Sequence, residues 1–226
     1  MFAKRPLPWL DFVASLKTGD IILMQGITPP SANEEMLLSS TWSHVGMAVL
    51  AADLGINVPD SSGVLFWESN QGADVTDVIL HVKKPGPVLA PIEERFVFNL
   101  TNGITGQIAT RKLHVRARKS LIEPLKEVIE KIHTAGFDTN AETLLLTFIM
   151  GRTANQPGTG TTFLCSELVA FTCQTMGLLT HQYVPNSYAP ADFSEKLDVS
   201  LLKGAWLGRE TFLDCSTLVP PKPPTP

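Results

Sequence analysis

Short apolar runs dominate the first half of the chain, and segments with helical spacing dominate the second half. Apolar runs bounded by turn residues are typical of β-strands. Such runs occupy residues 21–24, 43–51, 64–68, 75–82 and 88–92, and an alternating segment at 112–117 predicts a further strand. Pro91 removes a backbone hydrogen-bond donor, so the run at 88–92 is expected at the edge of a sheet.

Helical periodicity begins at residues 120–135, with Pro124 in the first turn and Gly136 at the end. Residues 140–151 predict another helix, and their apolar stretch 144–150 is expected to be buried as helix or strand. Strands that precede most of the helices indicate an α+β fold rather than alternating βαβ units.

A further helix is predicted to begin at Cys165, directly after the Gly- and Thr-rich loop 157–160, and to end at Gly177. A helix N-terminus presents unpaired N–H groups and a partial positive charge. Such a position lowers a thiol pKa from about 8.5 to roughly 3.5–7.5, and the same N–H groups can hold an oxyanion. Cys165 is therefore the candidate nucleophile; the alternative is a small, buried, apolar cysteine.

The other two cysteines differ from Cys165 in their surroundings. Cys173 lies within the same predicted helix and is expected in the core, and Cys215 lies in a polar segment without a partner. Three widely spaced cysteines argue against a disulfide framework, and the absence of a CxxC pair argues against structural zinc. Residues 1–20 lack the apolar core of a signal peptide. We therefore expect a cytoplasmic protein that needs no metal or organic cofactor.

Five histidines compete for the role of a base beside the cysteine. His44 opens a predicted strand, and the small residues Gly46 and Ala48 follow on its face, which leaves room for a second group to dock. His133 is expected to be solvated on the helix at 120–135. The sequence favours His44, although any single histidine is more often a surface or core residue than a base.

Glu68 is the candidate for a third group that orients the imidazole. It ends an apolar strand, where a carboxylate is explained either by a partner or by simple solvation. Both explanations stay open at this point. Asn70 and Gln71, on the same turn, are weaker candidates.

Composition excludes several classes of protein. The net charge of −4 and the lack of a basic stripe argue against nucleic-acid binding. No run of about 18 apolar residues occurs, so no transmembrane segment is expected. Residues 1–219 are expected to form a single domain, since 44% hydrophobic residues suffice for a core. The Pro-rich tail 220–226 is expected to be extended and mobile.

Five segments in order resemble a known family. They are Thr18 to Leu23, Trp42 to Val49, Glu68-Ser69, Phe163 to Val169 and Ser187 to Phe193. This order is similar to that of the circularly permuted papain-like amidases, the YiiX/YaeF-like group of the NlpC-type superfamily. The most specific part is Cys165-Ser166-Glu167-Leu168-Val169 after Ser43-His44-Val45-Gly46.

The resemblance implies a papain-like core in which a small antiparallel, barrel-like sheet packs against helices. It implies that Cys165 is the nucleophile, His44 the base and Glu68 the orienting group. In the related lecithin:retinol acyltransferase family a tyrosine stands two residues before the histidine and helps at the oxyanion. Here that residue is Trp42, whose indole can donate one hydrogen bond; the backbone N–H of Cys165 is the other candidate donor.

Ser43 and Ser166 flank the base and the nucleophile and are expected in the oxyanion or substrate cleft. The loops 25–42, 99–111 and 152–162 are expected to rim that cleft. We predict a cysteine hydrolase that cleaves an amide or related acyl bond in a small peptide, amide or acyl substrate, lipids included. The alternatives are an acyltransferase or lipase of the same fold and a catalytically silent binding module.

Overall fold

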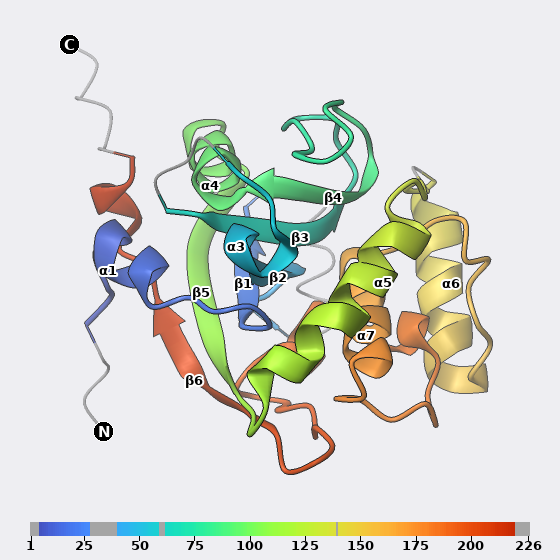
Figure 1. The fold of residues 1–226 in the computed structure, drawn as a ribbon. Coiled ribbons are helices and arrows are strands. Elements are labelled where there is room, and N and C mark those ends of the chain that lie inside the picture. The colour runs from blue at the N-terminus through green and yellow to red at the C-terminus, as the bar shows by residue number, and fades with distance from the viewer. Residues whose placement is uncertain (1–4, 28–39, 59–61, 139, 220–226) are drawn as a thin grey trace.

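The computed structural model describes residues 5–27, 40–58, 62–138 and 140–219, and its centre is a six-stranded antiparallel sheet (Figure 1). The strands pair in the linear order β4-β3-β2-β1-β5-β6, so they form an open sheet and not a closed barrel. Their bounds are β1 Ile21–Gly26, β2 His44–Leu50, β3 Val64–Asn70, β4 Gly86–Pro91, β5 Thr105–His114 and β6 Trp206–Phe212. The prediction of an α+β fold is confirmed, and β4 lies at a sheet edge as Pro91 suggested.

Helices cover both faces of the sheet, which explains why the central strands are continuous apolar runs. Alternate residues of β1 point to opposite cores: Ile21 and Leu23 pack in one, Ile22 and Met24 in the other. The first core is completed by α5 (Ile122–Ile132) and α7 (Cys165–Thr175), and the second by α1 (Trp9–Ala14) and α4 (Ile92–Thr101). Figure 1 shows these two groups of helices on opposite sides of the sheet.

Local sequence signals set the helix ends. The 3₁₀ turn η1 (Arg118–Leu121) leads into α5, whose Pro124 lies in the first turn. Gly177 follows α7 with φ of 69°, a left-handed conformation that favours glycine. The short α3 (Ala51–Leu54) follows β2 directly. The helices predicted at 120–135 and from Cys165 to Gly177 are thus confirmed.

Several predictions about segments are wrong. Residues 75–82 form turns and not a strand, because Asp77 accepts the backbone N–H groups of Ile79 and Leu80 and folds the chain back. The segment 99–111 is not a loop at the cleft, because it contains the end of α4 and most of β5. The strand expected at 112–117 is only the last part of β5, which ends at His114.

The helix α6 (Ala141–Ala154) exists as predicted, but it is not buried. Leu145, Leu146 and Ile149 are 42%, 59% and 41% exposed. The helix begins at Asn140, whose side chain accepts the N–H groups of the first turn. It packs against the turn η2 (Pro185–Ser187) at the outer side of the molecule (Figure 1).

Polar contacts to the segment 187–193 hold α6 in place. Arg152 forms a two-pronged ion pair with Asp192, at 2.7 and 3.1 Å, and donates to the carbonyl of Ser187. The 3₁₀ turn η3 (Pro190–Phe193) carries Asp192. The buried Asn186 amide donates to the carbonyl oxygens of Thr147 and Gln156. The segment Ser187 to Phe193, one of the five segments of the family resemblance, therefore has a structural role.

Two expectations concern residues outside the described ranges: the cleft loop 25–42, of which residues 28–39 are not described, and the tail 220–226. The C-terminal end of the described chain is the 3₁₀ turn η4 (Cys215–Thr217) and two further residues. Among the helices that the structure describes, none is both long and apolar enough to cross a membrane.

Candidate active site

The candidate site lies where the start of α7 meets the start of β2 and the last part of β3. Two hydrogen bonds join β3 to α7 and the loop before it. Ser69 Oγ donates to the carbonyl of Phe163 at 2.6 Å, and Trp67 Nε1 donates to Thr172 Oγ1 at 3.1 Å. Both bonds are buried, so the first residues of α7 are held against the end of β3.

Cys165 is the first residue of α7 and is partly exposed. The turn before it is closed by Glu167, whose Oε2 accepts the backbone N–H of Leu164 at 3.2 Å. Burial raises the pKa of Glu167 to about 7, although the Leu164 N–H opposes this effect. The Glu167 side chain thus completes the start of α7 through its bond to Leu164, and its Oε1 faces Gly158 of the preceding loop.

His44, the first residue of β2, lies between Glu68 and Cys165. Its Nε2 is 2.5 Å from Glu68 Oε2, and the imidazole is close enough to Cys165 for the charges of the two groups to interact. Because Nε2 faces Glu68, Nδ1 is the ring nitrogen left for the thiol. The His44 side chain is 22% exposed, so solvent reaches the imidazole, whereas the Glu68 side chain is fully buried.

The charge of His44 is set by its two neighbours. Burial alone lowers the pKa of His44, but the charges and hydrogen bonds of Cys165 and Glu68 outweigh it and raise the pKa to about 10. The arrangement therefore stabilises an imidazolium at neutral pH. This charge is the one that a neighbouring thiolate requires.

Phe66 fills the space that the sequence seemed to leave open beside His44. A Cβ atom on Gly46 would collide with the Phe66 ring, and this ring lies edge-on to His44 with centroids 6.3 Å apart. The small residue at position 46 thus admits Phe66 and not a docking group. The aromatic ring limits the positions that the imidazole can take.

Glu68 is fully buried and has two charged partners. Oε2 faces His44, and Oε1 lies 2.6 Å from Arg95 Nε. Burial raises the pKa of Glu68, but Arg95 and His44 together hold it below the usual value of 4.5. Solvation at a strand end, the alternative left open by the sequence, is wrong for this carboxylate. Sequence reasoning missed Arg95, which shares a face of α4 with the buried Ile92 and Phe96.

Trp42 and Ser43 already have hydrogen-bond partners elsewhere. The indole N–H of Trp42 donates to Glu210 Oε1 at 3.0 Å, and its rings stack on Phe212. Ser43 Oγ accepts the backbone N–H of Gly26 at 2.8 Å. Since an indole has a single N–H, Trp42 cannot also donate to an oxyanion while this bond persists. Ser166 is 3% exposed beside the nucleophile position.

The weaker candidates for the third group point elsewhere. Asn70 donates to the carbonyl of Gly72 and to Asp74, within its own turn. Gln71 follows β3 and is exposed. Another of the five histidines, His114, stacks face to face on Trp206 and not on the candidate site, with centroids 3.7 Å apart.

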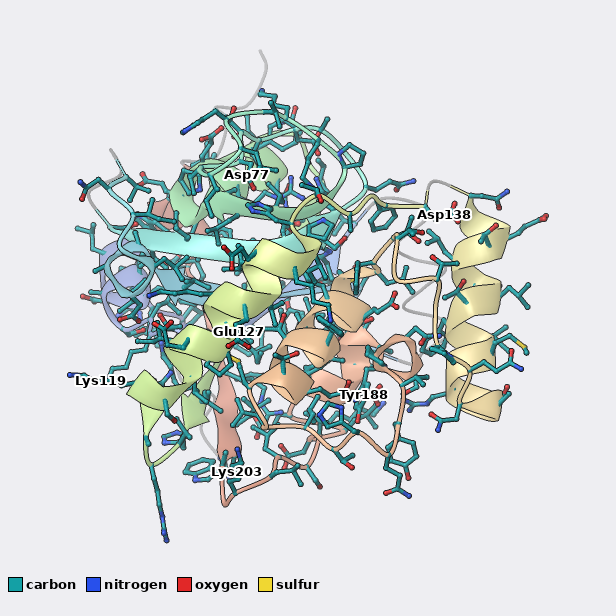
Figure 2. The ribbon with its side chains drawn as sticks, turned by 45° about the vertical axis from the view of Figure 1, so that its right-hand side comes forward. Asp77, Lys119, Glu127, Asp138, Tyr188 and Lys203 are labelled. Carbon is teal, nitrogen blue, oxygen red and sulfur yellow. The ribbon has the colours of Figure 1, made fainter. Side chains whose placement is uncertain are left out.

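The prediction that His133 is solvated is wrong. It is 4% exposed, and its Nε2 lies 2.5 Å from Asp77 Oδ2. Asp77 lies in the segment between β3 and β4, above the end of α5 (Figure 2). The pair joins this segment to α5, and Trp67 packs edge-on against the imidazole. Neither partner could be found from local sequence, because 56 positions separate them.

Among the described residues, no group of three or more His, Cys, Asp or Glu side chains could hold a metal ion. Cys173 is buried in the core, as the sequence predicted, and Cys215 is partly buried at η4.

Comparisons with known proteins give little further information. No protein-family model matches the chain, and no curated protein matches it. Among solved structures, one similar chain is the metalloprotein yiiX from Escherichia coli O157:H7, with 16% sequence identity and a TM-score of 0.45. The match covers 71% of this chain and 66% of that chain, just under two thirds of its length. At this similarity, function has to be inferred from the geometry of the chain itself.

Proposed function

We propose that the protein is a cysteine hydrolase that cleaves an amide or related acyl bond through an acyl-enzyme. The observation that carries the proposal is the arrangement of three side chains, in which His44 lies between Cys165 and Glu68. The thiol is at the start of α7, and the carboxylate is 2.5 Å from His44 Nε2. We propose a papain-like domain over residues 1–219. In it the base precedes the nucleophile, which is the reverse of the usual order and the mark of a circular permutation.

The first half of the reaction forms a thioester. The Cys165 thiolate attacks the substrate carbonyl carbon, and the carbonyl electron pair moves to oxygen. The oxyanion then collapses, the bond to the leaving nitrogen breaks, and the proton on His44 Nδ1 moves to that nitrogen. Glu68 stays ionised throughout and holds Nε2, so the imidazole keeps its orientation while its charge changes.

The second half releases the acyl group to water. A water molecule attacks the thioester carbonyl and gives its proton to His44 Nδ1. When the tetrahedral oxyanion collapses, the carbon–sulfur bond breaks and the thiolate leaves. The products are a carboxylic acid and the restored imidazolium–thiolate pair.

The backbone N–H of Cys165 is the proposed oxyanion donor. It is the first N–H of α7 and has no acceptor within the helix. The partial positive charge of the helix N-terminus adds to this stabilisation. Trp42 is the weaker candidate, because its N–H is bonded to Glu210.

A trapped acyl group on Cys165 would test the proposal. The protein is incubated with a panel of small peptides, N-acyl amides and acyl esters, and peptide mass spectrometry follows. We expect a hydroxylamine-sensitive adduct on Cys165 in the wild type and in the control Cys173→Ala, and none in Cys165→Ala. Binding without any adduct or turnover would instead indicate a silent binding module.

Acyl transfer to an amine is a second candidate, and the exposed side of α6 favours an apolar acyl group. Gly158 lies between Thr147 of α6 and Glu167 in the first turn of α7. The exposed Leu146 therefore lies on a helix that borders the loop before the nucleophile. Addition of a primary amine separates the candidates: a hydrolase yields the free acid, whereas a transferase yields the new amide.

A further inference from the structure

Arg95 is a buried cation beside the Glu68 carboxylate. It lies on α4, is 3% exposed, and sits in the helix face that packs on the sheet. Its Nε is 2.6 Å from Glu68 Oε1, and its Nη2 is 3.5 Å from Oε2. Because a buried guanidinium is stable only beside an anion, α4 and β3 are joined by opposite charges at this point.

The two oxygens of Glu68 have different nearest partners. Oε2 faces His44 and Oε1 faces Arg95, so rotation of the carboxylate would break both contacts. Beyond Arg95, Asp74 Oδ2 lies 3.5 Å from Nη1 and is nearer to solvent. The charges therefore alternate in sign from the thiolate through His44, Glu68 and Arg95 to Asp74.

Arg95 also determines the charge of Glu68. Burial raises the pKa of this carboxyl, and the charge of Arg95 is the largest effect that opposes it, ahead of the His44 hydrogen bond. Without Arg95, burial would favour the protonated carboxyl. A protonated Glu68 would no longer stabilise the imidazolium, and the thiolate would lose its partner.

We propose that Arg95 is a positioning residue for the Cys165–His44 pair, which acts by keeping Glu68 ionised and aimed at Nε2. Arg95 thereby sets the lowest pH at which the imidazolium–thiolate pair forms. The inference rests on the proposed hydrolase site, since Arg95 contacts neither the thiol nor a substrate.

The rate of Cys165 alkylation by iodoacetamide, measured from pH 4 to pH 9, tests this role. In Arg95→Met the acid limb of the rate–pH curve should move to higher pH by about one unit or more. On the rising part of this limb, each unit of the shift slows labelling about tenfold. The rate at pH 9 should stay near that of the wild type. Arg95→Lys keeps the charge and should restore most of the limb. The control Asp74→Asn leaves the Arg95–Glu68 contact intact and should follow the wild type.

A folded Arg95→Met protein with the wild-type acid limb would overturn the inference, because loss of packing alone lowers the melting temperature without moving the limb. If Arg95→Met does not fold, Arg95→Lys and Arg95→Gln are compared, and identical limbs in these two variants would overturn it. If the wild type showed no labelling at acidic pH, the proposed hydrolase site itself would be contradicted. If the wild type were labelled at acidic pH and Arg95→Met gave the same rate–pH curve, only the role of Arg95 would be contradicted.

Discussion

At the scale of single residues, the three cysteines differ in their surroundings. Burial raises the pKa of Cys173 to about 12, and burial also raises the pKa of Cys215. Cys165 instead lies beside an imidazolium at a helix N-terminus. Because only the thiolate reacts with alkylating agents, position in the fold should decide the order of labelling.

At pH 6, iodoacetamide should modify Cys165 at least about tenfold faster than Cys173 or Cys215. Peptide mass spectrometry at several times measures the three rates in one sample. In denaturant the three rates should become similar, which serves as the control. Similar rates in the folded protein would show that Cys165 has no special environment.

Substitutions at Glu68 and His44 should reduce the hydrolysis rate in a graded order. Glu68→Gln should retain part of the activity, because an amide oxygen can still accept the Nε2 hydrogen bond. Glu68→Ala should lose more, and His44→Ala most, since the base and the ion-pair partner vanish together. The rates and their pH profiles are measured with the substrate that acylates Cys165.

The same Glu68 variants should also lose stability, because each leaves Arg95 as a buried cation without its nearest anion. Breaking such a pair costs about 3–5 kcal/mol. Urea unfolding therefore accompanies the kinetics, so that a loss of folded protein is not counted as a loss of catalysis. Unchanged rates in folded Glu68→Ala would mean that Cys165 and His44 act as a dyad.

At the scale of elements, His133 and Asp77 connect the segment before β4 to α5. Asp77 accepts backbone N–H groups from Ile79, Leu80 and Leu89 as well as the His133 bond. Burial raises the pKa of Asp77, but the His133 and backbone hydrogen bonds outweigh it and hold the pKa below 3.8. The ionised form of Asp77 therefore stabilises the folded state.

Asp77→Asn should lower the free energy of unfolding at pH 7 by about 3 kcal/mol. Since the folded pKa is depressed, this contribution is present above the unfolded pKa and is lost as pH falls through the folded one. The difference between wild type and variant should therefore shrink below about pH 4. Urea unfolding at pH 7 and pH 3.5 measures it, with the exposed Asp11→Asn as control. A constant difference at both pH values would contradict this role.

Helix α6 depends on close packing at Gly151. A Cβ atom there would lie 2.6 Å from Asn186 Nδ2 and 2.8 Å from the Asn186 backbone. Gly151→Ala should therefore destabilise the protein by about 1–3 kcal/mol through overpacking, despite the higher helix propensity of alanine. Thermal unfolding measures the loss, and the exposed Leu146→Ala serves as control. Greater stability in Gly151→Ala would mean that α6 is free to move away from η2.

At the scale of the whole molecule, the sequence predicts the elements whose two faces are both apolar. The strands β1, β2 and β3 are such elements, because each is covered by helices on both sides. The strand β5 is less visible in the sequence, since it carries the buried Thr110 and Arg111. The buried guanidinium of Arg111 donates hydrogen bonds to the carbonyl oxygens of Phe193, Ser194, Leu207 and Gly208. Local sequence cannot show these distant partners.

Long-range polar pairs explain what else the sequence missed. Arg95 with Glu68 and His133 with Asp77 are each separated by more than 20 positions, and nothing nearby marks the partner. A helical reading of residues 92–101 would have given one signal for Arg95, because it shares a face with Ile92 and Phe96. By contrast, the residues at the start of α7 have a local signal, because helix ends are marked in sequence.

The central claim is that His44 holds Cys165 as a thiolate. The most direct test is the pH dependence of Cys165 alkylation in the wild type and in His44→Ala, followed by peptide mass spectrometry. In the wild type, rapid labelling should persist well below pH 7. In His44→Ala it should follow an ordinary thiol, with a midpoint near about 8.5. If the two proteins instead gave the same curve, His44 would not be the ion-pair partner and the proposed mechanism would be wrong.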